Sequence, residues 1–269
     1  MTKETKETEE GAPKIKVYLA GPDVFLPNPI QIGKDKKAIL ARHGIEGCFP
    51  FDNELPLGKN QQPREVAFAI AAGNEDMISK CTVVLANLMP WYGPGADNGT
   101  SFEMGFMSAR AMFDDPDVLI IGYYPEGFPD LASKRVADMV YGGKVMTNSD
   151  GFLVSTETGR SIEKFGLHDN LMLIGAIHKT GGKIYGSFEE AAANIKNLLA
   201  AKQQEQSAQK EKLQLPRDLK PSPQDQPVPK KDENTLWGYH LSKASVVSAA
   251  TAVVGAVAAA GFYVGRQSR

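Results

Sequence analysis

The sequence predicts a doubly wound, flavodoxin-like α/β domain, a parallel sheet of about five strands with helices on both faces. The expected strands are continuous apolar runs, such as "KIKVYLAG" (14–21) and "TVVLANL" (82–88), which is typical of strands buried on both faces. Segments with helical apolar spacing alternate with these runs, as in α/β proteins. Glycine and proline mark several of the junctions between them.

The elements are expected in a regular order. The strands are four short apolar runs at 14–21, 46–51, 82–88 and 117–124. The helices are 29–44, 63–81, a loop-helix unit at 95–113, 168–182 and 187–203. Gly44 suits the end of the first helix and Pro63 the first turn of the second. Residues 141–167, with several glycines and short strand-like pieces, are expected to form an excursion over the site or toward a neighbouring subunit.

Composition divides the chain into four parts. Residues 1–13 are charged and lack the apolar stretch of a secretory signal, so we expect a disordered N-terminus. Residues 14–204 form the folded domain. Residues 205–243 are rich in Gln, Lys and Pro with almost no apolar periodicity, which indicates a disordered linker. Residues 244–265 carry no charge and, as a helix, would span about 33 Å, close to the hydrocarbon core of a bilayer.

The uncharged segment 244–265 is expected to be a transmembrane tail anchor that leaves the folded domain in the cytosol. Lys243 precedes it, Arg266 and Arg269 follow it, and aromatic residues lie near its far boundary. The span favours the mitochondrial outer membrane, with the ER and peroxisome-type surfaces left open. The alternative is a soluble Ala-rich helix, because alanine is only weakly hydrophobic.

The charge and motif content excludes several function classes. The chain has 30 Lys and Arg against 32 Asp and Glu, so no basic excess indicates a nucleic-acid partner. Cys48 and Cys81 lack a CxxC spacing and the four histidines are scattered, so we expect reduced thiols of an intracellular protein and no metal. No GxGxxG, Walker or GxSxG motif is present, and we expect no cofactor.

Acid and amide side chains gather instead where the strands end. The loops that follow the strands, 20–28, 50–60 and 88–100, meet at the carboxyl edge of such a sheet, where ligands bind. These side chains and their neighbours are Asp23, Asn53, Glu54, Asp76, Asp97, Asn98 and Glu103. Carboxylates with few cations among them suit a neutral sugar or a nucleoside and disfavour a phosphate.

Two carboxylates at a sugar suggest glycosyl transfer, in which one attacks or stabilises the anomeric carbon and the other donates a proton. Glu103 is expected in the first turn of its helix, where the dipole favours an ionised carboxylate. Asp97, in the preceding loop, fits the second role. The competing interpretation is that Glu103 only complements the helix dipole and that Asp97 forms an Asx turn.

The chain resembles the nucleoside 2-deoxyribosyltransferase family over residues 14–200. The resemblance rests on the order and spacing of five motifs, of which the loop-helix unit is the strongest. They are "VYLAGPDVF" (17–25), "FPFDNE" (49–54), "GNEDMISKC" (73–81), "ADNGTSFEMGF" (96–106) and "HDNLML" (168–173). It implies a homo-oligomeric enzyme that acts on nucleosides and free nucleobases.

The resemblance implies a role for each catalytic candidate. Glu103 would be the nucleophile that forms a covalent 2-deoxyribosyl-enzyme, and Tyr18, at the end of the first strand, would orient it. Asp97 would hold the sugar hydroxyls, and Asp76 would handle the proton of the base. For Tyr18 the competing role is strand packing, and for Asp76 it is a solvated helix face.

The remaining candidates concern the base and the neighbouring subunit. Asn53 and Glu54 fall where the family contacts the base, and Asp23 and Phe25 are expected there too, with turn chemistry as the alternative for Asp23. Asn170 would reach the site of a neighbouring subunit, with helix capping as the alternative. Trp91 and Tyr92 would either cover the base or only pack within their loop.

The predicted reaction is therefore transfer of 2-deoxyribose between nucleobases in two displacements, with slow hydrolysis when water replaces the second base. Two alternatives stay open. One is an N-glycosidase acting on 2′-deoxynucleoside 5′-monophosphates, and the other is a membrane-tethered module that binds nucleosides without catalysis.

Overall fold

The computed structural model describes residues 15–53, 62–214, 235–236 and 239–240. Two units are distinguished: Met1–Ala132 with Leu167–Ser207, and Ser133–Gly166 with Ala208–Arg269. The predicted N-terminal segment 1–13 and membrane segment 244–265 lie outside the described residues. Within the described residues, no helix combines the length and apolar character that a membrane crossing needs.

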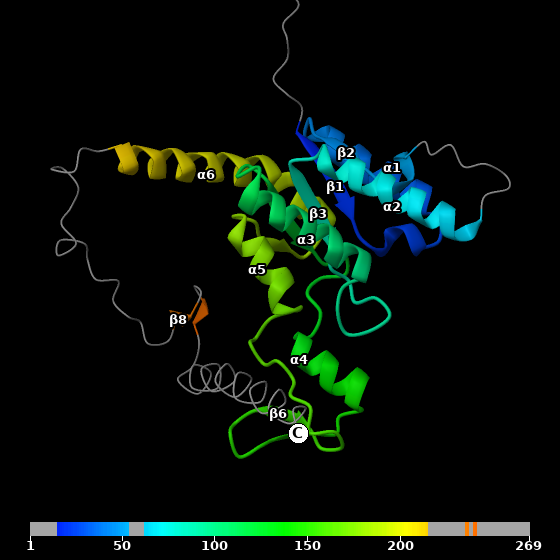
Figure 1. Cartoon of the computed structure of the whole chain (residues 1–269), viewed down its shortest axis with the longest axis vertical. Coiled ribbons are helices and arrows are strands. Elements are labelled where there is room, and N and C mark those ends of the chain that lie inside the picture. The colour runs from blue at the N-terminus through cyan, green and yellow to red at the C-terminus, as the bar shows by residue number, and fades with distance from the viewer. Residues whose placement is uncertain (1–14, 54–61, 215–234, 237–238, 241–269) are drawn as a thin grey trace, which may run out of the picture. The chain divides into compact units, whose positions relative to one another are not determined.

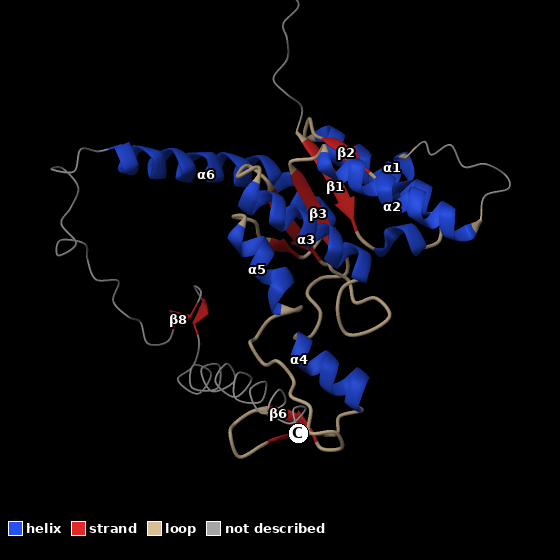
Figure 2. Ribbon diagram, in the orientation of Figure 1, coloured by secondary structure: helices blue, strands red, loops and turns tan. Residues whose placement is uncertain are grey.

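The first unit is built on a five-stranded sheet, and every neighbouring pair of its strands is parallel (Figure 1 and Figure 2). In spatial order the strands are β2 (Glu46–Cys48), β1 (Lys16–Ala20), β3 (Val83–Asn87), β4 (Leu119–Tyr123) and β7 (Ile184–Tyr185). This order is that of flavodoxin-like sheets and confirms the predicted fold class. The strand β7 has only two residues, too few for an apolar run to reveal it in the sequence.

Helices cover both faces of the sheet. One face carries α1 (Pro29–Arg42) and α6 (Phe188–Gln214), and the other carries α2 (Pro63–Ser79), α3 (Asn98–Phe113) and α5 (Leu171–Lys179). The four predicted helices before α6 agree with these bounds to within three residues. Short 3-10 turns η1 (Pro22–Phe25) and η2 (Pro50–Asp52) follow β1 and β2 at the carboxyl edge.

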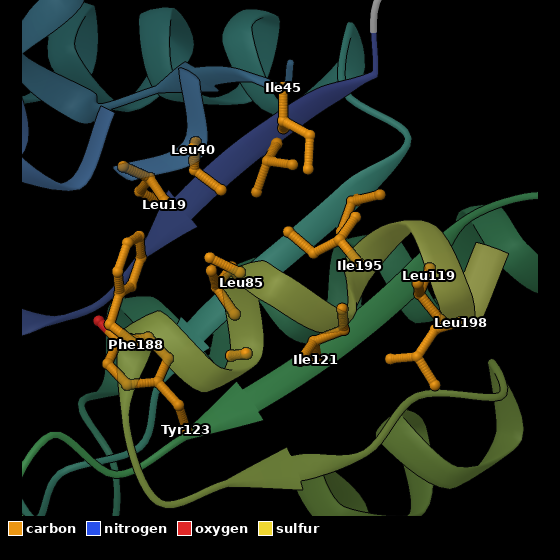
Figure 3. Packing of buried hydrophobic residues seen from close by; sticks show 14 of the residues in the cluster. Leu19, Leu40, Ile45, Leu85, Leu119, Ile121, Tyr123, Phe188, Ile195 and Leu198 are labelled. Carbon is orange, nitrogen blue, oxygen red and sulfur yellow. The ribbon is translucent and has the colours of Figure 1, made fainter. Parts of the chain in front are cut away.

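Alternation along β1 divides its side chains between two cores. Val17 and Leu19 pack under α1 and α6, together with Leu85 and Ile195 (Figure 3). Tyr18 packs on the opposite face, beneath the helices α2, α3 and α5. A strand presents successive side chains to opposite faces, so a tyrosine between two aliphatic core residues is directed toward the α3 side.

The strand order reverses beside β1. The chain leaves β1 for β2 on one side and later returns to β3 on the other. Such a reversal opens a crevice outside the carboxyl ends of the two central strands, and ligands bind there in open α/β sheets. The functional candidates therefore belong to the segments that follow β1 and β3.

The predicted linker 205–243 was partly wrong. Helix α6 continues through the first ten residues of this segment and ends at Gln214, because Gln, Glu, Lys and Ala are good helix formers. Pro216 lies two residues after the helix end. A further antiparallel pair, β8 (Thr235–Leu236) and β9 (Tyr239–His240), also lies within the predicted linker.

The second unit contains most of the predicted excursion 141–167. Its strands β5 (Val145–Thr147) and β6 (Leu153–Ser155) pair antiparallel, in agreement with the strand-like pieces expected there. The short helix α4 (Ala132–Arg135) continues directly into the π-helical turn η3 (Val136–Val140). No helix was predicted for these residues.

Candidate active site

The site begins at the start of α3, which Asp97 caps. The Asp97 carboxylate accepts a hydrogen bond from the backbone N–H of Thr100 at 3.0 Å, as an N-cap residue does. The hydroxyl of Ser101 donates to the Asp97 carbonyl at 2.9 Å. Because the helix begins at Asn98, Glu103 lies in the second turn, and the prediction of a first-turn glutamate was wrong.

Glu103 belongs to the stripe of α3 that faces the sheet. Thr100, Met104 and Met107 are buried on this side, whereas Phe102 is 60% exposed. Positions 100, 103, 104 and 107 follow the spacing of one helix face. The glutamate is therefore held against the sheet in the row of buried side chains.

Tyr18 meets Glu103 from the sheet. Its hydroxyl donates a hydrogen bond to Glu103 Oε1 at 2.6 Å, between residues 85 positions apart. Tyr18 is completely buried and lies in the middle of β1, two residues before the end at which the sequence analysis placed it. Among the described residues, no hydrogen bond reaches the other carboxylate oxygen, Oε2.

Burial controls the ionisation of this pair. Removal from water raises the pKa of Glu103 to about 7; the Tyr18 hydrogen bond opposes the increase, and the charge of Asp97 adds to it. Burial and the neighbouring carboxylate raise the pKa of Tyr18 as well, so the phenol stays a donor. The helix dipole was expected to favour the charged form, but that effect fades beyond the first turn.

The loop before α3 is held in place by Asp169, which the sequence analysis missed. Asp169 is buried and accepts hydrogen bonds from the backbone N–H groups of Ala96 at 3.1 Å and Asn170 at 2.7 Å. A side chain at Gly95 would approach its carboxylate to 3.3 Å. Its signal was present in the "HDN" motif, one position before a predicted site residue.

Asn170 is exposed and caps α5, accepting from the backbone N–H of Met172 at 2.9 Å. Helix capping, the alternative role considered for it, is therefore present. Its reach into a neighbouring subunit stays a prediction.

Asp23 forms a buried ion pair at the end of β1. Its carboxylate lies 2.7 Å from the Lys36 ammonium, and the Asn87 amide donates to both of its oxygens at 3.3 Å. A side chain at Gly21 would come within 2.6 Å of Asn87 and 2.8 Å of Asp23, so only glycine fits there. Protein groups thus occupy both oxygens of Asp23, and its contact with a base stays a prediction.

Lys36 and Asn87 were not among the predicted site residues. Lys36 also donates to the Tyr123 hydroxyl at 2.6 Å, and burial lowers its pKa although Asp23 opposes this. No sequence motif links positions 23, 36 and 87. Only the folding of α1 over the carboxyl end of the sheet brings them together.

The structure does not bring Asp76 to the Tyr18–Glu103 pair. Asp76 is exposed on α2 and paired with Lys80 one turn later, which is the solvated helix face weighed as its alternative. The side chain of Asn53 donates a hydrogen bond of 2.7 Å to Asn74. Asn74 lies on α2, two positions before Asp76. Glu54 lies outside the described residues.

Aromatic side chains gather in the loops after β1 and β3. Phe25 is 62% exposed and stacks on Trp91, with ring centroids 5.9 Å apart and planes at 18°. The ring centroids of Tyr92 and Trp91 lie 4.9 Å apart. Tyr92 is almost fully exposed, and its backbone has a left-handed φ of 51°. Asn98 is exposed at the first position of α3.

Over the described part of the chain, no group of three or more His, Cys, Asp and Glu side chains could hold a metal ion. The site offers a partly buried carboxylate oriented by a phenol.

Comparison with known proteins gives a consistent result. The family model for nucleoside 2-deoxyribosyltransferases matches residues 17–172. An uncharacterized protein of Schizosaccharomyces pombe is 28% identical over 194 residues, which cover 68% of this chain and 88% of that protein.

Two solved structures match this chain over nearly their whole length. A 2-deoxyribosyltransferase of Leishmania mexicana is 28% identical, with coverage of 68% of this chain and 97% of that one and a TM-score of 0.46. A conserved protein of Enterococcus faecalis is 18% identical, with coverage of 69% and 99% and a TM-score of 0.41. The family match spans more than half of the sequence and includes the Tyr18–Glu103 pair, and the chain belongs to the nucleoside 2-deoxyribosyltransferase family.

Proposed function

We propose that the protein transfers 2-deoxyribose between nucleobases through a covalent ester on Glu103. The observation that carries this proposal is the 2.6 Å hydrogen bond from Tyr18 to Glu103 Oε1. It fixes one oxygen of a half-buried carboxylate and leaves the other, Oε2, for attack. A nucleophile oriented by a second, more deeply buried group is a recurring arrangement in covalent catalysis.

In the first step, Oε2 of ionised Glu103 attacks C1′ of a 2′-deoxynucleoside. The glycosidic C–N bond breaks, its electron pair stays on the base nitrogen, and the base leaves with a proton. In the second step, a nitrogen of another base attacks C1′ and releases the carboxylate. Two inversions give net retention. Water in place of the second base gives hydrolysis.

The raised pKa of Glu103 suits this role. A carboxylate with a pKa of about 7 is a stronger base and nucleophile than an ordinary one, and it is substantially ionised at neutral pH. Asp97 holds the start of α3 with Oδ2, which leaves Oδ1 for a sugar hydroxyl. Asp76 or solvent water would supply the proton of the departing base.

The two alternative functions fit the site less well. A 5′-monophosphate needs cationic side chains or a cradle of N–H groups, but the buried cation Lys36 beside the first loop is paired with Asp23. A module without catalysis would have no need for a buried tyrosine bonded to a glutamate. Comparison of deoxyinosine with its 5′-monophosphate as substrates separates the first alternative from the proposal.

The decisive experiment is base exchange. The protein is mixed with a deoxynucleoside and a different free base, and the swapped nucleoside is measured by chromatography. Glu103→Gln is expected to lose both exchange and hydrolysis by about 10³-fold or more, and the exposed Glu205→Gln on α6 serves as the matched control. The wild-type Glu103 peptide should carry a 2-deoxyribosyl adduct after acid quench. Unimpaired exchange by Glu103→Gln would refute the assignment.

A further inference from the structure

Two cysteines flank the tyrosine of the site, and the proposed reaction uses neither. Cys48 is the last residue of β2 and the direct partner of Tyr18 in the parallel pairing of β1 with β2. Paired residues in neighbouring strands point to the same face, and their strands lie about 4.8 Å apart. The Cys48 side chain therefore lies beside Tyr18 on the α3 side of the sheet, where it packs against the same buried cluster.

Cys81 approaches from the other direction. It lies between α2 and β3, is completely buried and belongs to the cluster that contains Tyr18. Its thiol lies 3.5 Å from the carbonyl of Met77. Both cysteines are free thiols, and both lie close enough to Tyr18 for their charge to raise the pKa of its phenol.

The two thiols interact with each other, and they are not equivalent. The interaction with Cys81 lowers the pKa of Cys48, and Lys16 also favours the Cys48 thiolate, against burial and the nearby carboxylates. The same interaction and burial raise the pKa of Cys81. Cys48 is only partly buried. It is thus both the more accessible thiol and the one that ionises first, which is the profile of a reactive cysteine.

We propose that Cys48 and Cys81 form an oxidation site, at which a hydroperoxide joins the two sulfurs in a disulfide beside Tyr18. In the first step, the Cys48 thiolate attacks one oxygen of the peroxide. The O–O bond breaks, hydroxide or alkoxide leaves and takes up a proton, and Cys48 becomes a sulfenic acid. In the second step, the Cys81 sulfur attacks the Cys48 sulfur, the S–O bond breaks and water leaves with the Cys81 proton. Two thiols are oxidised by two electrons, and the peroxide is reduced.

The disulfide would act on the Tyr18–Glu103 pair. An S–S bond of about 2.05 Å is much shorter than any noncovalent sulfur contact, so closure draws the end of β2 and the segment between α2 and β3 toward each other beside Tyr18. The hydrogen bond from Tyr18 to Glu103 is 2.6 Å long, and a displacement on the order of 1 Å would break it. We therefore expect the oxidised protein to lose transferase activity; this consequence rests on the proposed function.

The test uses the full chain treated with hydrogen peroxide. Free thiols are then blocked with iodoacetamide, and the protein is digested without reduction. Mass spectrometry should find the Cys48 and Cys81 peptides joined, and base exchange should fall at least tenfold and return after dithiothreitol. In Cys81→Ala the Cys48 sulfenic acid should be trapped by dimedone, and in Cys48→Ala no adduct or disulfide should form. Cys81→Ser replaces Cys81→Ala if the truncation lowers stability.

Two outcomes would overturn the inference. The first is that both thiols remain free at a peroxide dose that oxidises an exposed cysteine. The second is equal loss of activity in wild type and in the Cys48→Ala/Cys81→Ala double variant. Peptide mapping needs no turnover, so a protein that forms the disulfide but exchanges no bases would contradict the proposed function and leave the oxidation site standing.

Discussion

Asp97 and Glu103 lie on the same helix, one at its cap and the other in its second turn, and the negative charge of Asp97 raises the pKa of Glu103. Tyr18 acts on the same carboxylate in the opposite direction. Ionisation of the proposed nucleophile is thus set by burial and then adjusted by two neighbours of opposite effect. Each neighbour can be removed separately.

The pH dependence of kcat/KM should report the proposed nucleophile. Glu103 must be ionised to attack, and its pKa of about 7 means that activity rises with pH through neutrality and levels off above it. Tyr18→Phe removes the hydrogen bond that favours the carboxylate, so this acid limb should move to higher pH. We also expect kcat/KM to fall by about 10- to 100-fold, because Glu103 loses its orientation. An acid limb that moves downward would contradict the assignment.

Asp97→Asn should move the acid limb of the pH profile of kcat/KM to lower pH. The amide keeps the N-cap hydrogen bond to Thr100, since Asn and Asp cap helices about equally well, but it removes the charge that raises the pKa of Glu103. Activity should fall as well if Asp97 binds the sugar. The limb position is therefore read from the pH profile of the residual activity. Unfolding measurements should show little change, which separates this effect from loss of the cap.

Glu103→Gln should be more stable than wild type at alkaline pH. The ordinary pKa of a glutamate applies in the unfolded chain and the raised one in the folded protein, so the folded protein binds the proton more tightly. Its stability therefore falls as pH rises from about 4.5 to 7 and then stays low. Near pH 8 the glutamine should stabilise the protein by about 2–3 kcal/mol, and near pH 4.5 by little. Urea unfolding at both pH values measures the difference.

The buried pair of Asp23 and Lys36 should be sensitive to removal of one partner. Lys36→Met leaves a buried carboxylate without its cation, at a cost of about 3–5 kcal/mol. The double variant Lys36→Met/Asp23→Asn should recover much of this stability. Lys80→Met, which breaks the exposed pair with Asp76, is the matched control and should change the unfolding midpoint little. Equal effects of the two lysine variants would show that burial does not matter here.

Membrane attachment through residues 244–265 remains our proposal from the sequence, since these residues lie outside the described structure. Expressed in cells, the full chain should sediment with membranes and resist extraction at high pH, whereas the chain without residues 244–269 should stay in the supernatant. Recovery of the full chain in the supernatant would contradict the proposed anchor. Colocalisation with organelle markers would then test the expected mitochondrial outer membrane.

The fold was predictable because its signals are local. Buried strands such as 82–88 read as continuous apolar runs, and helix ends are marked by Gly44 or Pro63. Element ends were less predictable. Asp97 starts α3 at Asn98, and that cap alone moves Glu103 into the second turn and removes the expected influence of the helix dipole.

The site was only partly predictable. Glu103 was a candidate from its place beside a second carboxylate, Tyr18 was identified through the family resemblance, and the structure brings them together. The pairing of Asp23 with Lys36 and the tether from Asp169 to Ala96 join segments far apart in the sequence. Neither charge sign nor spacing distinguishes these buried partners from surface residues, so only tertiary structure reveals them.

The position of Tyr18 in the middle of β1 has a consequence for how such an enzyme can diversify. Its strand is held by β2 on one side and β3 on the other, whereas Phe25, Trp91 and Tyr92 lie beyond the strand ends. Insertions or exchanges in those outer segments would leave the packing around Tyr18 and Glu103 unchanged. If the proposed transfer is correct, the reaction and its range of bases are open to separate evolution.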